Sequence, residues 1–365
     1  MIDRRTLLLG AVAAPTIIRQ TARADEPMYV LAWGGFTDQD LIDRFTAQTG
    51  VGLIVDNISS YDEINLRLRS SYGPQYSVVI PHEGLTRDLQ QEGLIQPIDI
   101  AQIPNIAGID PHFALETDTV IGNEKYAIPA LFGTCPCIYN TEKLPEPPAN
   151  WADLASADFT GQIGMLDDPF SNFNLAGRAI GSLHMPLMTE SQFNDAADLL
   201  HDLKGERVSH FTASPVDLVT RLRQGKCTIS LTGYEAMTIY AEAQGKLAVA
   251  RLAPGDFTFV QTFAIPATAP NPAAAHQFIN FMLDPGEQAG LANRTQRGIV
   301  NLAAVPMIDP VVAGLTNYAD LDAVFAQSPI TGFPPLNQTA RAGATWTDWV
   351  IAWDEIRLTD SKAAP

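Results

Sequence analysis

The apolar positions of the chain follow two patterns that alternate along its length. Short continuous runs such as "MYVLAW" are typical of buried strands, and apolar residues three or four positions apart are typical of helices. The first such helix has the stripe Leu41, Ile42 and Phe45, and we expect Thr37 to cap it and Gly50 to end it. A strand, a glycine turn and a helix in this order are typical of an open α/β sheet, in which ligands bind where the strands end.

The alternation of strands and helices continues after this first helix. "VGLIVD" and "YSVVIP" have the pattern of strands, whereas "SSYDEINLRLRS" and "TRDLQQEGLI" have the pattern of helices, the first of them opened by Ser60 and Glu63. Two strand–helix–strand units within so short a stretch predict a mainly parallel sheet with right-handed crossovers.

A second α/β series follows a long, nearly uncharged strand run, "EKYAIPALFGTCPCIYNTEKL", and a Pro-rich loop, "LPEPPANW". It has strands at "GQIGMLDD", "GKCTISLTG" and "LAVARLAP" and helices at "ESQFNDAADLLHDLKGE" and "YEAMTIYAEAQG". The segment "FTFVQTFAIPATAPNPAAAHQFINFML" then returns through a strand into a helix. We therefore expect the chain to leave a first domain near residue 133 and to return near residue 263, which gives a hinge of two crossing strands and a cleft between two lobes.

The last segment, "NQTARAGATWTDWVIAWDEI", has the pattern of an amphipathic helix. Trp346, Trp349 and Trp353 recur at helical spacing, and we expect them to pack in the core rather than to contact a ligand.

The first residues have the features of an export signal. Arg4 and Arg5 precede the apolar run "LLLGAVAAPTII", and Ala22-Arg23-Ala24 offers a cleavage site of small residues. The run is roughly a dozen residues long, whereas a membrane span needs about 20. We interpret residues 1–24 as a twin-arginine signal peptide cleaved after Ala24, with a general secretory signal as the alternative. The mature protein is then expected in the periplasm, without stable membrane insertion.

The composition restricts the class of partner. The 365 residues include 23 Lys and Arg against 41 Asp and Glu, a net charge of −18. This balance argues against nucleic acid or an anionic membrane surface as a partner. It is compatible with a cationic ligand, although a solvated acidic surface is the commoner explanation.

Signatures of catalysis and of metal binding are missing from the sequence. There is no HExxH, GxSxG, P-loop or GxGxxG motif, and the six histidines are scattered without metal-ligand spacing. The pair Asp167-Asp168 follows a predicted strand and could in principle serve acid–base chemistry. We expect no enzyme activity, no metal and no cofactor, and an exported enzyme is the alternative.

Three cysteines, Cys135, Cys137 and Cys227, allow at most one internal bridge. In "GTCPCIYN" the first two are expected on the same face of one strand. Three interpretations stay open: buried inert thiols, a bridge from Cys227 to one of the pair, and metal or redox chemistry.

A series of segments matches a known pattern in collinear order over nearly the whole mature chain. They are "LAWGGFTDQDLIDRFTAQTGVGLIVD", "YSVVIP", "QQEGLIQPID", "KYAIPALFGTCPCIYN", "NWADL", "FTGQIGMLDDP", "FAIPATAPNPAAAHQFINFML" and "NLAA". Together they resemble bacterial extracellular solute-binding proteins of the spermidine/putrescine-binding group. The resemblance implies a periplasmic receptor, monomeric, that closes on a small solute and delivers it to an ABC permease in the inner membrane.

The resemblance also implies the α/β type II fold of periplasmic binding proteins. Each lobe is then a mainly parallel sheet flanked by helices, and crossing strands form the hinge. We expect residues 27–133 and 263–305 in lobe 1 and residues 134–262 and 306–360 in lobe 2.

Two residues match ligand-binding positions of that group. Trp33 matches an aromatic residue that walls the cleft and stacks on the solute, although a core role is the alternative. Asp168 matches an acid that pairs with a ligand ammonium, and a helix N-cap before Pro169 is its alternative.

Other positions depart from the polyamine pattern. A second acid is replaced by Ser171, an acid before "AIP" by Gln261, and a tyrosine before "NLAA" by Arg297. Arginine grips a carboxylate in a bidentate manner, so Arg297 opposite Asp168 would suit a zwitterion, whereas a hinge or surface ion pair is the alternative for Arg297.

The predicted ligand-binding residues are Trp33, Gly34, Phe36, His82, Asp168, Ser171, Tyr234, Phe259, Gln261 and Arg297. The expected ligand is a polyamine such as spermidine or putrescine, and a zwitterionic or anionic amino compound is the alternative. A ferric-ion receptor is disfavoured because such receptors use clustered, often adjacent, tyrosines and no two tyrosines are adjacent here.

Overall fold

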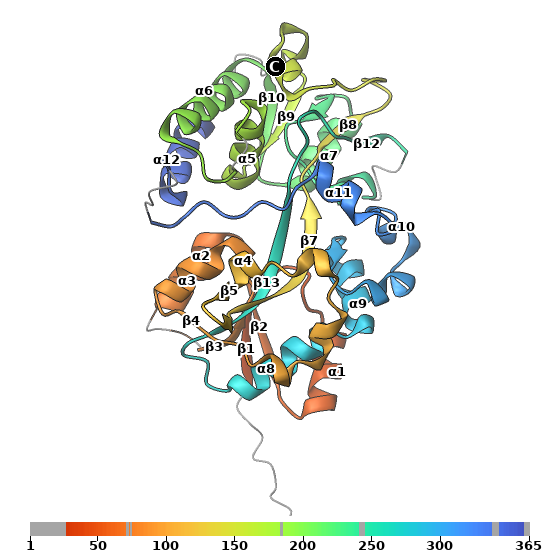
Figure 1. The fold of residues 1–365 in the computed structure, drawn as a ribbon. Coiled ribbons are helices and arrows are strands. Elements are labelled where there is room, and N and C mark those ends of the chain that lie inside the picture. Colours follow the sequence, from red (N-terminus) through yellow and green to blue (C-terminus); the bar gives the residue numbers. More distant parts are fainter. Residues whose placement is uncertain are drawn as a thin grey trace, which may run out of the picture.

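The computed structural model describes residues 27–70, 73, 75–182, 185–240, 245–337 and 343–360. The predicted signal peptide, residues 1–24, lies outside the described residues. Two lobes, each built on its own sheet, are connected by long segments that run between them (Figure 1). The α/β two-lobed fold class predicted from the sequence is confirmed.

The sheet of the first lobe is parallel on one side and antiparallel on the other. Strands β1, β2 and β3 pair in parallel, as the strand–helix–strand pattern predicts. The returning strand β13 pairs antiparallel with β3 and β7, and β14 pairs antiparallel with β7. The strand order is β14 (Gly298–Ile299), β7 (Ala127–Thr134), β13 (Thr258–Pro266), β3 (Tyr76–Val79), β1 (Met28–Trp33) and β2 (Leu53–Ile58), with β4 (Ile95–Gln96) pairing β13.

The sheet of the second lobe is also mixed, so the prediction of a mainly parallel sheet in each lobe is wrong. β9 pairs in parallel with β10 and β11, and β8 pairs antiparallel with β11 and β12. The strand order is β10 (Val208–Thr212), β9 (Ile163–Leu166), β11 (Ile229–Ser230), β8 (Cys137–Asn140) and β12 (Leu247–Ala250). A small hairpin, β5 (Val120–Ile121) with β6 (Glu124–Lys125), lies outside both sheets.

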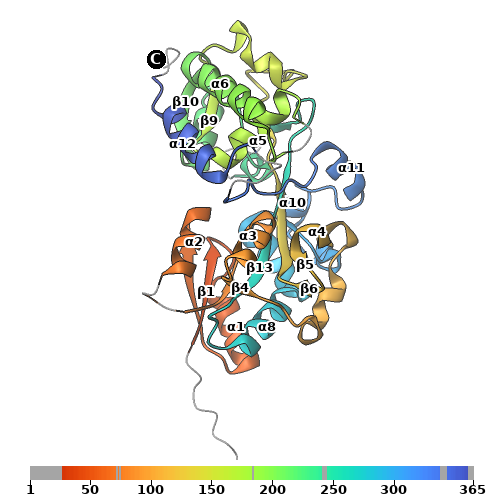
Figure 2. The ribbon, with the colours of Figure 1, turned by 60° about the vertical axis from the view of Figure 1, so that its left-hand side comes forward.

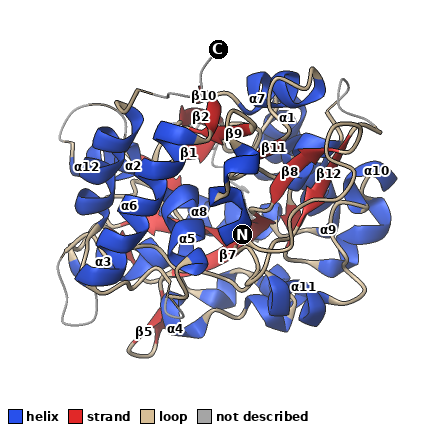
Figure 3. Ribbon diagram, turned by 90° about the horizontal axis from the view of Figure 1, so that it is seen from above, coloured by secondary structure: helices blue, strands red, loops and turns tan. Residues whose placement is uncertain are grey.

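Helices flank the strands of both lobes, as the view from above shows (Figure 3). The first lobe carries α1 (Gln39–Thr49), α2 (Tyr61–Arg69), α3 (Thr86–Gln91), α4 (Glu116–Thr119), α8 (Pro272–Met282) and α9 (Pro285–Thr295). The second lobe carries α5 (Pro169–Ala179), α6 (Glu190–Glu206), α7 (Pro215–Arg223) and α12 (Trp346–Arg357). Beside the hinge lie α10 (Pro310–Ala313) and α11 (Leu321–Gln327).

The helix boundaries that the sequence predicts agree with the structure for α1 to within one residue, and one predicted helix is much shorter than expected. Helix α1 is capped by Asp38, whose Oδ1 accepts from the backbone N–H of Leu41 at 2.8 Å, so the prediction of Thr37 as the cap is wrong by one residue. Gly50 ends the helix at φ +75°, a conformation that glycine adopts without strain. The predicted helix "YEAMTIYAEAQG" is only a short 3₁₀ turn, Glu235–Thr238, and residues 241–244 are outside the described residues.

The cysteine-containing run is not one strand. Strand β7 ends at Thr134, β8 begins at Cys137, and Pro136, which has no backbone N–H to donate, lies between them. Cys135 and Cys137 therefore do not share a strand face, and all three cysteines are buried and free, so the predicted alternative of a disulfide bridge is wrong. Burial raises the pKa of the Cys227 thiol to about 12 and the pKa values of the other two well above their usual range.

A third segment, residues 328–336, also crosses between the lobes (Figure 2). It pairs with the start of β13, because the N–H of Thr258 donates to Pro329 and the N–H of Thr331 donates to Thr258, each at 2.9 Å. Before this crossing, Phe325 on α11 packs on Phe113 and Phe132 of the first lobe. We therefore propose this third crossing at residues 328–336 in place of the boundary at residues 305–306.

Candidate functional site

A cavity of about 580 Å³ lies between the two lobes. It is lined where β1, β2, β9, β10 and β11 end and the chain turns into the next element, together with one face of α12. The carboxyl ends of strands are where ligands bind in open α/β sheets, which agrees with the location expected from the sequence. Nine of the ten predicted residues line the cavity: Trp33, Gly34, Phe36, Asp168, Ser171, Tyr234, Phe259, Gln261 and Arg297.

His82 is the predicted residue that does not line the cavity. Its side chain is fully buried, and its ring lies one layer behind the wall, 5.0 Å from the ring of Phe170 and 5.9 Å from that of Tyr61. Nδ1 is 2.7 Å from a carboxylate oxygen of Glu83, whose pKa is raised by burial. His82 therefore supports two cavity-lining rings rather than meeting a ligand directly.

Asp168 is the N-cap of α5, as the alternative from the sequence proposed, and it also lies at the cavity wall. As the N-cap of α5 it accepts from the backbone N–H of Ser171 at 3.3 Å, and its Oδ2 accepts from the Ser171 hydroxyl at 2.6 Å. The same oxygen lies 3.5 Å from the hydroxyl of Tyr234, and the side chain borders the cavity. Burial raises the pKa of Asp168, and these three donors oppose the rise because they stabilise the ionised form.

Arg297 brings a positive charge to the other side of the cavity. Its guanidinium carbon lies 4.2 Å from the centre of the Tyr234 ring and 5.9 Å from that of Phe259. Arg297 comes from the first lobe, next to β14, whereas Tyr234 follows β11 of the second lobe. The cation–π contact therefore joins the two lobes across the cavity. Arg297 and Asp168, which the sequence analysis placed opposite each other, both line this cavity.

An aromatic wall closes one side of the cavity. Trp33 is half-buried, donates its indole N–H to the carbonyl of Ile80 at 2.9 Å, and lies 4.9 Å from the ring of Tyr61 in an edge-on arrangement. Tyr61 in turn is 4.8 Å from Phe333 and 5.9 Å from Phe170. Rings of both lobes thus form one continuous cluster, in which each pair adds about 0.5–1.5 kcal/mol beyond its buried area.

The tryptophans of α12 combine two functions. All three are buried, which confirms the predicted core packing, and Trp349 is fully enclosed. Trp346 and Trp353 also line the cavity and donate their indole N–H groups to Asp62 at 2.8 Å and to Asp167 at 2.7 Å. The first of these hydrogen bonds joins the two lobes, because Asp62 lies on α2.

Sequence reasoning missed several residues of the cavity. Tyr61 and Asp62 come shortly after the end of β2, and Trp33 is the last residue of β1, so the rule of strand ends could have found them as well. Trp346 and Trp353 could not be placed by that rule, since they reach the cavity from the C-terminal helix.

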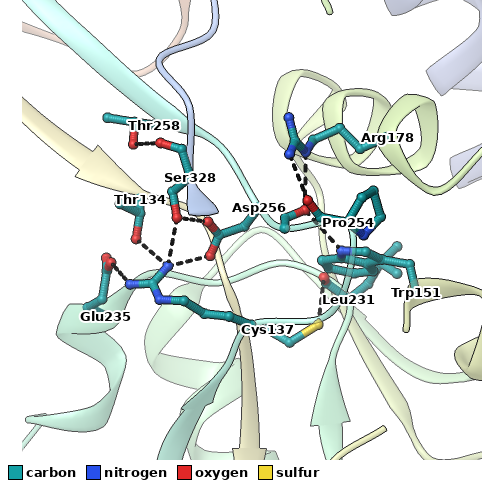
Figure 4. A network of polar contacts seen from close by, with 12 residues as sticks. Thr134, Cys137, Trp151, Arg178, Leu231, Glu235, Pro254, Asp256, Thr258 and Ser328 are labelled. Carbon is teal, nitrogen blue, oxygen red and sulfur yellow. Dashed lines mark hydrogen bonds and ion pairs between the residues drawn. The ribbon is translucent and has the colours of Figure 1, made fainter. Parts of the chain in front are cut away.

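Behind the cavity, Arg251 joins the segments of the hinge. One of its terminal nitrogens donates to Asp256 at 2.5 Å, to Ser328 at 3.0 Å and to Thr134 at 3.2 Å. The other donates to Glu235 at 3.0 Å. Figure 4 shows that these four partners come from separate segments and gather at one point. Each of the three crossing segments contributes a partner of Arg251, so the network holds the three segments together at the hinge.

The described part of the chain contains no group of three or more His, Cys, Asp or Glu side chains arranged to hold a metal ion. In the same residues, every helix is too short or too polar to cross a membrane.

Comparisons with known proteins cover nearly the whole chain. A family model described as bacterial extracellular solute-binding protein matches residues 40–323. The chain is 25% identical to the spermidine/putrescine-binding periplasmic protein of Escherichia coli (strain K12) over 329 residues, 88% of this chain and 91% of that protein. It is 27% identical to the putrescine/cadaverine-binding protein of Pseudomonas aeruginosa, covering 97% of each. The solved structure of the spermidine/putrescine ABC transporter substrate-binding protein from Streptococcus pneumoniae is similar with a TM-score of 0.71 at 22% identity, covering 91% of this chain and 98% of that one.

Proposed function

Because the family match spans residues 40–323, the chain belongs to the bacterial extracellular solute-binding proteins, and we propose that it is the receptor of an ABC importer for a small solute carrying an ammonium group. The relatives named above bind spermidine, putrescine or cadaverine, all of which carry such groups. The observation that carries the proposal is the carboxylate of Asp168 beside aromatic rings in a cavity between the lobes.

The mechanism that we propose is closure around the solute. The ammonium group pairs with Asp168 of the second lobe, while Trp33 and Tyr61 of the first lobe cover the solute's hydrocarbon chain. A solute that touches both lobes binds the closed form better than the open form, and it therefore shifts the population toward closure. The permease then distinguishes the closed receptor from the open one. The protein binds its solute without chemical change and without a cofactor.

The proposal includes export to the periplasm, with residues 1–24 removed after Ala24. The Escherichia coli and Pseudomonas aeruginosa relatives both bind polyamines by name, and the Escherichia coli protein is also periplasmic by name. An inner-membrane ABC permease is the expected partner, and the receptor is expected to act as a monomer.

The first test is the thermal stability of the mature protein with candidate solutes. At about 100 times its Kd, a ligand stabilises the folded protein by about 2.7 kcal/mol, which raises the melting temperature by several degrees. We expect such a rise with at least one member of a panel containing putrescine, cadaverine, spermidine, 4-aminobutanoate and 5-aminopentanoate. Butane-1,4-diol is the matched control, because it has the chain of putrescine without charges. Equal melting temperatures across the whole panel would contradict the proposed function.

Binding is also expected to depend on pH through Asp168. Its pKa in the free protein is raised by burial, whereas Tyr61, Tyr234 and Cys135 around it stay neutral because burial raises their pKa values too. An ammonium group beside Asp168 favours the ionised form and lowers its pKa, so that solute binding below the free pKa releases a proton. Affinity should fall as the pH drops through this raised pKa and level off above it. Calorimetry in buffers of different ionisation enthalpy measures the released proton, and uptake of a proton on binding would contradict the assignment.

A further inference from the structure

The guanidinium of Arg297 lies at the wall of the cavity. Arg297 makes no ion pair and no hydrogen bond with any residue that the structure describes, and its side chain is only half-buried at the cavity wall. Arg294, three residues earlier, donates instead to the carbonyls of Gly35 and Phe36 at 3.3 and 3.1 Å. The guanidinium N–H groups of Arg297 are therefore available to an acceptor inside the cavity, whereas those of Arg294 already donate to backbone carbonyls.

The surrounding backbone leaves room for Arg297 at this position. Helix α9 ends at Thr295, and the φ of +53° at the next residue, Gln296, is unusual for a residue other than glycine and turns the chain at Arg297. Gly133 on β7 lies beneath it. A Cβ there would be 3.0 Å from Cδ of Arg297 and 2.7 Å from Cζ of Phe259, so a larger residue would displace both side chains.

Tyr234 lies between Asp168 and Arg297 at the cavity wall. Its hydroxyl is 3.5 Å from Asp168, while the guanidinium of Arg297 lies over its ring face at 4.2 Å. A ligand that meets both charges must therefore carry a positive group on the side of the ring hydroxyl and a negative group over the ring face. The ammonium and carboxylate of a short ω-amino acid lie at opposite ends of its chain and can reach these two places.

The other charged residues of the cavity lining for which the structure shows a contact each have at least one partner in the protein. Asp62 and Asp167 each accept an indole N–H from α12, and Asp354 pairs with Arg357 at 3.5 Å. A diamine with one ammonium on Asp168 and the other toward Arg297 would bring two like charges together, which is unfavourable.

From these contacts we infer that the solute is a short ω-amino acid, with its ammonium on Asp168 and its carboxylate held by the fork of Arg297. This inference rests on the proposed function and specifies its substrate class. The carboxylate would supply the acceptors that Arg297 lacks in the protein, in the bidentate geometry for which guanidinium is suited. Because Arg297 is in the first lobe and Asp168 in the second, such a solute would join the lobes through its two ends.

The test compares solutes of equal length that differ at one end. Calorimetric titrations pair 4-aminobutanoate with putrescine and 5-aminopentanoate with cadaverine, and 2-aminobutanoate serves as the α-amino acid. We expect the wild type to prefer the ω-amino acid of at least one pair by about tenfold or more, whereas stronger binding of 2-aminobutanoate would overturn the assignment of an ω-amino acid. In Arg297→Gln, affinity for the ω-amino acid should fall by about tenfold to a hundredfold, while affinity for the matched diamine stays equal or rises.

The control is Arg69→Gln, which removes one positive charge from a pair with Glu92 outside the cavity lining and should leave both affinities unchanged. If Arg297 only clamps Tyr234 across the lobes, its loss will weaken both solutes of a pair alike, and the inference fails. Preference of the wild type for the diamine also overturns it while leaving the proposed function intact. Absence of binding to every solute overturns both. The preference between the ω-amino acid and the diamine is measured on the wild type alone, so it tests the inference even if Arg297→Gln does not fold.

Discussion

Replacing Asp168 with asparagine should weaken binding of the ammonium solute by about tenfold to a hundredfold without unfolding the protein. A charge-assisted hydrogen bond contributes about 1.5–3 kcal/mol, and each 1.4 kcal/mol corresponds to a factor of ten in affinity. Asparagine keeps the size of the side chain and is as good an N-cap as aspartate, so the start of α5 should be preserved. The loss is therefore expected in the affinity and not in the fold.

The ligand-free variant gives a second readout that points the opposite way. Because burial raises the pKa of Asp168, its ionised form is less favourable in the folded protein than in the unfolded chain. Removing the charge should leave the melting temperature of the ligand-free protein at neutral pH equal or higher. Asp198→Asn on the exposed face of α6 is the matched control, with affinity unchanged. Wild-type affinity in Asp168→Asn would refute the assignment of the ammonium to this carboxylate.

The parts of the site that follow local rules were predictable from the sequence. Trp33 and Asp168 both lie where a strand ends and a helix begins, and that position alone directs them toward the cleft of an open sheet. The capping role of Asp168 followed from the proline after it, in the same way. The cap of α1 was misplaced by one residue because Thr37 and Asp38 are both good caps, and only the backbone conformation decides between them.

The contacts between lobes could not be predicted in this way. His82 follows β3 closely, but the chain turns into a 3₁₀ helix there and directs its ring behind Tyr61 instead of into the cavity. The bond from Trp346 to Asp62 joins residues 284 positions apart, and nothing in either local sequence indicates it. Apolar spacing predicts that Trp346 is buried, but not which side of the helix borders a cavity.

Loss of Arg251 should destabilise the protein by about 3–5 kcal/mol, because the substitution Arg251→Met leaves two buried carboxylates without their cation. The side chain of Asp256 is fully buried and that of Glu235 is 12% exposed. Arg251 also holds Thr134 and Ser328, so the three crossing segments lose their common partner. Denaturant or thermal unfolding of the ligand-free protein measures the effect.

Arg178→Met is the matched control for this substitution. Arg178 also lies at the hinge, but it donates to the carbonyls of Pro254 and Gly255 at 3.0 and 3.1 Å rather than to a carboxylate (Figure 4). Its loss should cost about 0.5–1.5 kcal/mol per hydrogen bond, less than the loss of Arg251. Equal destabilisation by the two substitutions would mean that burial of carboxylates is not what makes Arg251 important.

The pH dependence of the Arg251 variant separates an unpaired charge from lost packing. Burial raises the pKa of Glu235 to about 7 even with Arg251 present, and the pKa of Asp256 is raised as well. A carboxyl whose pKa is higher in the folded than in the unfolded protein binds protons preferentially in the folded state, so its contribution to stability decreases as the pH rises. Without Arg251 both pKa values should rise further, and the difference in stability from the wild type should be small near about pH 5 and grow toward about pH 8. A difference independent of pH would instead assign the loss to packing of the arginine side chain, and the ionic account of the hinge would be wrong.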